Sequence, residues 1–196
     1  MTGTENAEKL EKGLYKFSVR ALISQNRPTP HDEASIAFIT LLQTLTQAGW
    51  QPALPYGAPR LSGEQAFKYY LEAGTYATLP VDYAPTLEEW MRIKSGSWRF
   101  YAGDLFMNIA VRRSGSQVVN EPGAYLLSFS LYGKEERGRK QVRPSERDQW
   151  RTLWVDEVKK LKRTRYAIEE KLTRQGYTID TDYVEPIVHP ADPVEP

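Results

Sequence analysis

The sequence contains no cysteine, and this absence excludes several chemistries at once. Without a thiol the chain has no disulfide, no thiolate nucleophile and no thiolate metal site. Histidine is scarce as well, since the 196 residues include only two. His31 falls in the first turn of a predicted helix and His189 in a proline-rich tail, and neither position suggests a Ser-His-acid triad or a histidine metal site. A chain without cysteine fits a reducing compartment, so we expect a cytoplasmic protein.

Two further absences concern nucleotides and membranes. The chain has neither a GxxxxGK[ST] phosphate loop nor a GxGxxG turn, so the common nucleotide-binding motifs are missing. No apolar run approaches the roughly 18 to 20 residues that a membrane-spanning helix needs, and the polar start of the chain has no apolar h-region. We therefore expect a soluble protein with no cofactor, no metal site and no membrane partner.

The composition that remains is that of an ordinary globular protein. Hydrophobic residues make up 40% of the chain and charged residues 26%, which is enough for one sizeable core in a single domain. The net charge is only +1, but residues 134–174 hold fourteen Lys or Arg against eight Asp or Glu. Residues 175–196 hold five acids and no Lys or Arg. We expect this acidic tail to fold back over the basic segment, to bind a basic partner or, as we favour, to be disordered.

Hydrophobic periodicity predicts the elements of the first half. Residues 14–24, LYKFSVRALIS, alternate apolar and polar side chains as a strand with one buried face does. Residues 30–48 keep helical spacing and predict a strongly amphipathic helix. Residues 60–96 then form a small helical insertion, in which Thr86 and Glu89 match a capping box.

The second half returns to strands. Residues 98–113 are predicted to pair with residues 124–132 in an antiparallel hairpin. They form either two strands separated at Gly103 or one bent strand. A long helix with an apolar stripe is expected over 145–174. Residues 177–184 resume the pattern of a strand.

Together these elements predict an α+β fold. We expect a mostly antiparallel sheet with the two long amphipathic helices packed on one face, in a split βαβ-like order, and a small helical insertion. The single domain is expected to span 14–183, with its insertion at 60–96. A flexible leader at 1–13 precedes it, and an acidic, proline-rich tail at 184–196 follows.

Positive charge is concentrated in the loop expected between the hairpin and the long helix, YGKEERGRKQVRPSER. The free N–H groups and the dipole of a helix N-terminus favour an anion, and arginine binds phosphate in a bidentate manner. Two glutamates within the stretch favour the alternative, an ordinary solvated connector. The candidate anion-binding residues are Lys134, Arg137, Arg139, Lys140 and Arg143.

The helical insertion gathers aromatic side chains that carry a polar atom. Tyrosine and tryptophan of this kind suit a protein interface or a ligand groove. The alternative is that they attach the insertion to the core. The candidate partner-binding residues are Tyr69, Tyr76, Tyr83 and Trp90.

Three functions remain open on the sequence. The absence of a catalytic constellation favours a non-enzymatic protein-binding protein of the inhibitor, immunity or adaptor type, whose partner is another protein. The alternative is a protein that binds nucleic acid or a phosphate ligand through the basic loop at 134–143. The third is an enzyme with a pocket of carboxylate, tyrosine and arginine side chains under the insertion.

Overall fold

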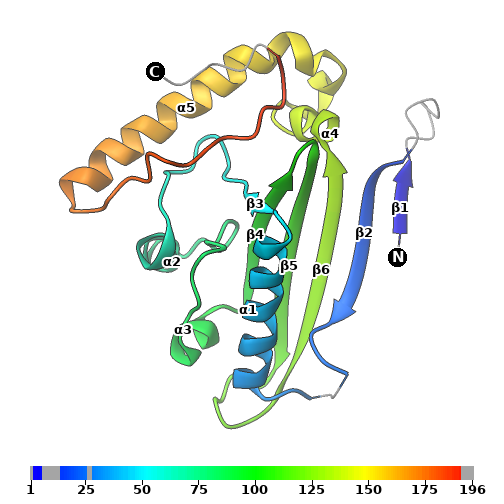
Figure 1. Ribbon diagram of the computed structural model, residues 1–196, viewed down its shortest axis with the longest axis vertical. Helices are drawn as coiled ribbons and strands as arrows, with labels where there is room; N and C mark the ends of the chain where they lie inside the picture. The colour runs from blue at the N-terminus through cyan, green and yellow to red at the C-terminus, as the bar shows by residue number, and fades with distance from the viewer. Residues whose placement is uncertain (1, 6–13, 26–27, 191–196) are drawn as a thin grey trace.

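The computed structural model describes residues 2–5, 14–25 and 28–190, and its centre is a six-stranded antiparallel sheet (Figure 1). The strands lie in the order β1-β2-β6-β5-β4-β3. They are β1 (Thr2–Glu5), β2 (Leu14–Leu22), β3 (Gln51–Pro52), β4 (Ser95–Ala102), β5 (Leu105–Gly115) and β6 (Gly123–Gly133). The helices are α1 (His31–Gln47), α2 (Gly63–Glu72), α3 (Leu87–Arg92), α4 (Lys134–Arg139), the 3₁₀-helix η2 (Pro144–Gln149) and α5 (Trp150–Arg174). The predicted α+β class is confirmed.

The predicted hairpin is the centre of the sheet. β5 pairs with β6 in one continuous register that begins with Leu105 opposite Gly133. β4 joins β5 through a tight turn at Gly103, whose φ of +54° favours glycine. The segment predicted over 98–113 is therefore two strands separated at Gly103, which is one of the two alternatives.

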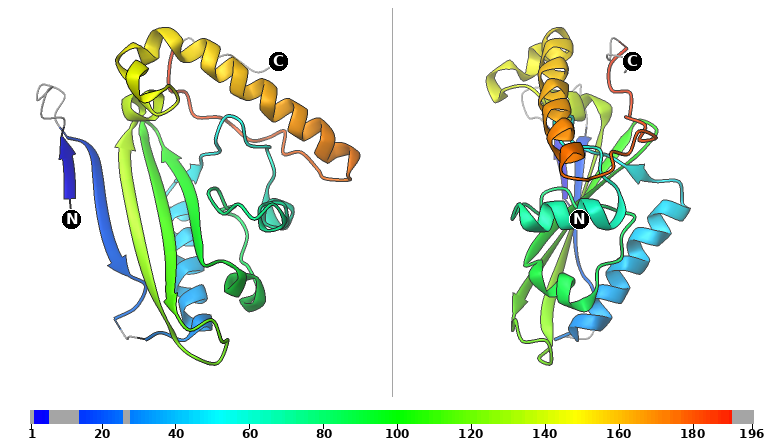
Figure 2. Two further views of the ribbon diagram at one scale, coloured as in Figure 1. Left: turned by 180° about the vertical axis from the view of Figure 1, so that it is seen from behind. Right: turned by 90° about the vertical axis from the view of Figure 1, so that its left-hand side faces the viewer.

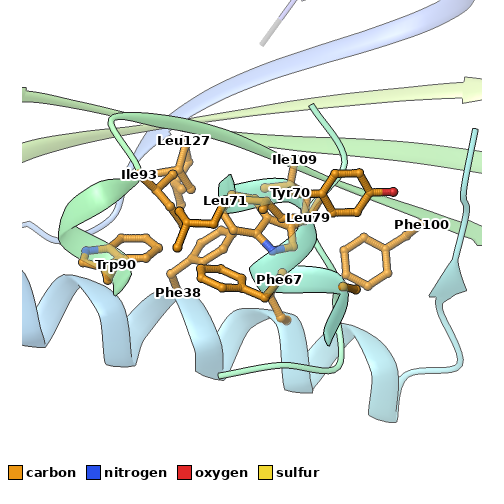
Figure 3. Packing of buried hydrophobic residues seen from close by; sticks show 14 of the residues in the cluster. Phe38, Phe67, Tyr70, Leu71, Leu79, Trp90, Ile93, Phe100, Ile109 and Leu127 are labelled. Carbon is orange, nitrogen blue, oxygen red and sulfur yellow. The ribbon is translucent and has the colours of Figure 1, made fainter. Parts of the chain in front are cut away.

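One face of the sheet, here called the covered face, carries α1 and the helical insertion (Figures 1 and 3). Phe38 of α1 lies at its centre, with ring centroids 4.5 Å from Trp98 and 5.6 Å from Trp90. Figure 3 shows Phe67 and Leu71 of α2 in the same cluster. Burial of these side chains drives the folding of the domain and attaches the insertion to the sheet.

The long helix α5 lies across the end of the strands, beside α4 (Figures 1 and 2). Its first turns bury Trp150 and Trp154 in a second cluster with Phe106 and Tyr132. Near its C-terminus, Leu172 joins the core of the covered face instead. α5 therefore links the two hydrophobic clusters.

The strand predicted over 177–184 is wrong, because this segment has no ladder partner among the described residues. It runs back beside α5 as an irregular chain (Figure 1). This segment forms hydrogen bonds to the loop between β3 and α2. The Asp180 N–H donates to the Arg60 carbonyl (2.7 Å), and the Tyr183 hydroxyl accepts from the Leu54 N–H (2.9 Å). Alternation in the sequence does not reveal whether a strand edge is within reach.

The described part of the acidic tail folds back over α5, which is one of the three outcomes left open. Glu185 lies 2.8 Å from the Lys162 Nζ and 2.7 Å from the Arg165 Nη2. The Arg165 side chain is fully buried and also donates to two loop carbonyl groups. The positive charge of α5 is thus partly neutralised within the chain. The tail beyond Pro190 lies outside the described residues.

The N-terminal leader contributes the edge strand β1. It pairs antiparallel with β2, with Thr2 opposite Ser18. Residues 6–13 of the leader lie outside the described residues.

Candidate functional site

The sheet face opposite α1 lies open below α4 and α5 (Figure 2). Because β4, β5, β6 and β2 pair in register, every second residue of each strand points to this side. We call this surface the open face. Below the buried Phe106 and Tyr132 it comprises Lys16, Ser18, Arg20, Leu22, Ser97, Arg99, Asn108, Ala110, Arg112, Leu126, Ser128 and Ser130. None of these residues is buried.

The charge on the open face has one sign. Lys16 and Arg20 come from β2, Arg112 from β5 and Arg99 from β4. In their paired stretches these strands and β6 place no Asp or Glu on the open face, although the chain holds 25 acidic residues. A positive potential therefore accumulates over this face while the whole molecule stays close to neutral.

The cations of the open face are largely unneutralised. Within the described part of the chain, Lys16, Arg20 and Arg112 form no ion pair with a carboxylate. Arg99 donates from Nε to the Ala77 carbonyl at 3.3 Å and keeps its charge without a carboxylate partner. Burial, and to a smaller extent the Arg137 guanidinium, lower the pKa of Arg99. The site therefore has electrostatic capacity for an anion.

Small polar side chains occupy the space between the cations. The Ser97 hydroxyl donates to the Asn108 Oδ1 at 2.5 Å. The two amide hydrogens of Asn108 therefore point away from Ser97. Ser128 and Ser130 add hydroxyl groups on β6. Three strand spacings separate β2 from β4, so the two rims of cations lie about 14 Å apart. The centre thus offers hydrogen-bonding groups between positive rims.

The basic stretch meets the open face at Lys140. Tyr132 pairs with Lys16 in register, and the Lys140 Nζ lies 3.7 Å from the centroid of the Tyr132 ring. Burial lowers the pKa of Lys140, and Lys16 and Arg147 lower it further, whereas Glu136 opposes them. Lys140 thus extends the line of cations that begins with Lys16 on β2.

The other anion-binding candidates are engaged elsewhere, because the expected loop is helical over α4 and η2. Lys134 pairs with Asp104 at 2.7 Å, and Arg139 lies 3.3 Å from Asp148. Arg143 is exposed at the start of η2. The five candidates therefore do not converge on one site.

Arg137 has the most unexpected position of the five. Its side chain is only 3% exposed, and its Nη2 donates to the Leu54 carbonyl at 3.1 Å. Its guanidinium lies 5.2 Å from the Tyr56 ring centroid and 5.4 Å from that of Phe106. This arrangement is typical of a structural cation–π contact in a core.

The aromatic candidates divide between core and surface. Trp90 is 2% exposed and donates from Nε1 to the Tyr125 hydroxyl at 3.2 Å. The Tyr83 hydroxyl donates to Glu89, the capping residue of α3, while Tyr76 is half-buried. Tyr83 and Trp90 therefore stabilise the insertion, and the surface beneath it is filled by the core (Figure 3).

Tyr69 lines a hollow between α2 and the end of α5. The hollow has a volume of about 350 Å³. The centroids of the Tyr69 and Tyr177 rings lie 6.3 Å apart, and the planes of the two rings meet at 81°. Its lining residues are Tyr69, Glu72, Ala73, Ile168, Lys171, Leu172, Gln175 and Tyr177.

Sequence reasoning missed a buried polar cluster at the start of α1. His31 is 1% exposed, and its Nδ1 lies 2.5 Å from the Tyr125 hydroxyl. Burial lowers the pKa of His31, and the nearby Arg113 guanidinium adds to this effect. Gly123 permits the packing, since a Cβ there would lie 2.7 Å from the His31 ring. No local sequence signal marks this contact, because it joins residues far apart in the chain.

Sequence reasoning also missed the open face, although part of its signal was present. The polar positions of the strand predicted over 14–24 are Lys16, Ser18 and Arg20, with no acid among them. Only the strand order reveals that Arg99 and Arg112 share their face.

Comparisons with known proteins give this chain no relative. No family model matches it, and neither a curated protein nor a solved structure does so. Across residues 2–5, 14–25 and 28–190, the helices are too short or too polar to cross a membrane. In the same ranges no three His, Asp or Glu side chains are grouped as metal ligands.

Proposed function

We propose that this chain is a nucleic-acid-binding protein and that its binding surface is the open face. The observation that carries the proposal is the exclusion of carboxylates from a sheet face that presents Lys16, Arg20, Arg99 and Arg112. A cytoplasmic location, which the cysteine-free composition predicts, would give the chain access to RNA.

The chemistry of the open face fits a phosphate backbone. Arginine contacts phosphate oxygens in a bidentate manner, and serine and asparagine side chains are common additional donors to phosphate and sugar. The face extends over four strands, whereas small ligands prefer concave sites. A polymer that spreads its charge over the surface therefore suits this face better than a small phosphate ester.

Protein binding remains the second candidate function, favoured by the hollow beside Tyr69. Its lining combines two tyrosines and aliphatic side chains with Glu72, Lys171 and Gln175, which suits an amphipathic side chain of a protein partner. An inhibitor, immunity or adaptor protein would act through such a contact. An enzyme pocket under the insertion has less support, because core side chains occupy that space.

Paired substitutions test the proposed function. Arg20→Gln with Arg112→Gln removes two exposed cations from the open face. Lys159→Gln with Arg163→Gln removes two exposed cations from α5 and is the matched control. Affinity for a fluorescent oligonucleotide is measured by anisotropy at low salt.

We expect the open-face pair to lose about tenfold in affinity per arginine, because each charged hydrogen bond is worth about 1.5 kcal/mol or more. The α5 pair should stay close to the wild-type affinity. Equal losses in both pairs would show that binding follows net charge and not this face.

A further inference from the structure

The geometry points to double-stranded RNA as the occupant of the open face, bound through its phosphates and 2′-hydroxyl groups without stacking of its bases. This inference rests on the proposed function and names the ligand of the same face. It depends on three features: which aromatic rings are accessible, where the cations lie, and what lies between them.

Aromatic rings on this side of the sheet are withdrawn from the binding surface. Phe106 is 1% exposed and Tyr132 8%, and Lys140 lies over the Tyr132 ring. Tyr101 is half-buried, and its hydroxyl donates to Gln51 at 2.6 Å on the edge strand β3. The described residues between the cations therefore offer no ring for a base.

This lack of rings disfavours single strands. Stacking on aromatic side chains contributes about 1–3 kcal/mol per base to single-strand binding. At the centre of the open face the bases would meet Ser128, Ser130, Asn108 and Ala110 instead. A single strand would have to be ordered without this gain, whereas a duplex presents its phosphates already in place.

The arrangement of charge matches an A-form minor groove. Lys16 and Arg20 form one rim on β2 and Arg99 lies on the other side, about 14 Å away across three strand spacings. Between them β5 and β6 present the hydroxyl and amide groups of Asn108, Ser128 and Ser130, and Arg112 and Leu126 lie further along the same two strands. The minor groove of double-stranded RNA is wide and shallow, with phosphates along both sides and 2′-hydroxyl groups between them.

B-form DNA fits the same surface less well. Its minor groove is narrow and carries no 2′-hydroxyl groups, and its major groove is read by elements that protrude, such as a helix or a two-stranded ribbon. The open face has no such protrusion along the paired stretches of its strands. We therefore expect DNA duplexes to gain the phosphate contacts alone.

A competition experiment separates these alternatives. Single-stranded RNA, double-stranded RNA and double-stranded DNA of one sequence and length compete for the full chain at one low salt concentration. We expect double-stranded RNA to bind at least about tenfold more tightly than either competitor, as one or two extra hydrogen bonds would give.

The other outcomes have distinct meanings. Single-stranded RNA that binds as tightly as the duplex would overturn this inference and leave the proposed function standing. Equal affinity for the two duplexes would overturn the role of the 2′-hydroxyl groups. Absence of binding to all three would overturn the proposed function itself.

A variant pair tests the central hydroxyl groups. Ser128→Ala with Ser130→Ala should weaken binding to double-stranded RNA several-fold and weaken binding to double-stranded DNA clearly less. Thr75→Ala removes a hydroxyl from an exposed position after α2 and should change neither. Equal losses for RNA and DNA would contradict recognition of the 2′-hydroxyl groups. Unchanged thermal midpoints verify that the variants are folded.

Discussion

Lys140 places its Nζ 3.7 Å from the centroid of the Tyr132 ring, and this contact joins the basic stretch to the open face. Tyr132 lies beside Lys16 across the β2–β6 pair. The stretch therefore contributes to the binding surface through one residue and not as a unit. Lys134 and Arg139 pair with Asp104 and Asp148, and Arg137 is buried in the second cluster.

This division predicts different effects for two lysines of the same stretch. Lys140→Gln should weaken oligonucleotide binding several-fold, because it removes a cation beside Lys16. Lys134→Gln should have little effect, since Lys134 lies 2.7 Å from Asp104, whereas Lys140 is 3.8 Å from Glu136 and reaches the Tyr132 ring. Anisotropy titrations of both variants at one salt concentration give the comparison, and a larger loss for Lys134→Gln would contradict this assignment.

Arg137 is predicted to act in stability. Arg137→Ala should lower the free energy of unfolding by about 2–3 kcal/mol, because the half-buried Leu54 carbonyl loses its donor and two rings lose a stacked guanidinium. Arg143→Ala, at an exposed position, should change it by less than about 0.5 kcal/mol. Urea denaturation measures both values. Equal stability of the two variants would show that Arg137 does not stabilise the second cluster.

The contacts of Glu185 predict that the tail stabilises α5. Glu185→Gln should destabilise the fold by about 3 kcal/mol, because Arg165 and Lys162 lose their carboxylate in a buried site. Glu170→Gln is the control, since Glu170 pairs with Arg174 at an exposed position. Thermal denaturation compares them, and a control variant as unstable as Glu185→Gln would contradict the prediction.

His31 predicts a loss of stability in acid. Burial lowers its pKa in the folded chain, whereas the unfolded chain keeps the ordinary value of 6.5. Between these two values the unfolded state binds more protons, so the free energy of unfolding falls as the pH falls through this window. Arg113 and Tyr125 face the ring, and Asp32 partly opposes the shift.

The variant His31→Gln should remove this part of the pH dependence. The free energy of unfolding, measured by urea denaturation at a series of pH values below 7, reports it. An identical slope in both proteins would assign the titration to another group.

Local patterns in the sequence were enough to predict the strands and the first long helix. The alternation in β2 and β6 and the helical spacing of α1 depend on the periods of one element, which the sequence displays directly. The break at Gly103 is also a local signal, because glycine interrupts the strand pattern at that position. Predictions failed where a second element decides the outcome, as in 177–184, which bonds to the loop at Leu54 and Arg60 and not to a strand edge.

The candidate site depended even more on distant contacts. Lys16 and Arg99 share a face because β6 and β5 lie between their strands, and that order is not encoded in either strand. Arg137 belongs to the second cluster because Tyr56 and Phe106 approach it from other elements. Charge in the sequence indicated where cations are, but not which of them remain accessible.

The salt dependence of binding tests the central proposal most directly. Each phosphate that the open face neutralises contributes about −0.9 to the slope of log K against log salt concentration. Lys16, Arg20, Arg99, Arg112 and Lys140 together predict a slope between about −4 and −5 for a duplex, and Arg20→Gln with Arg112→Gln should reduce its magnitude by about 2. No binding at low salt, or the same slope in the variant, would contradict the proposal that nucleic acid binds to this face.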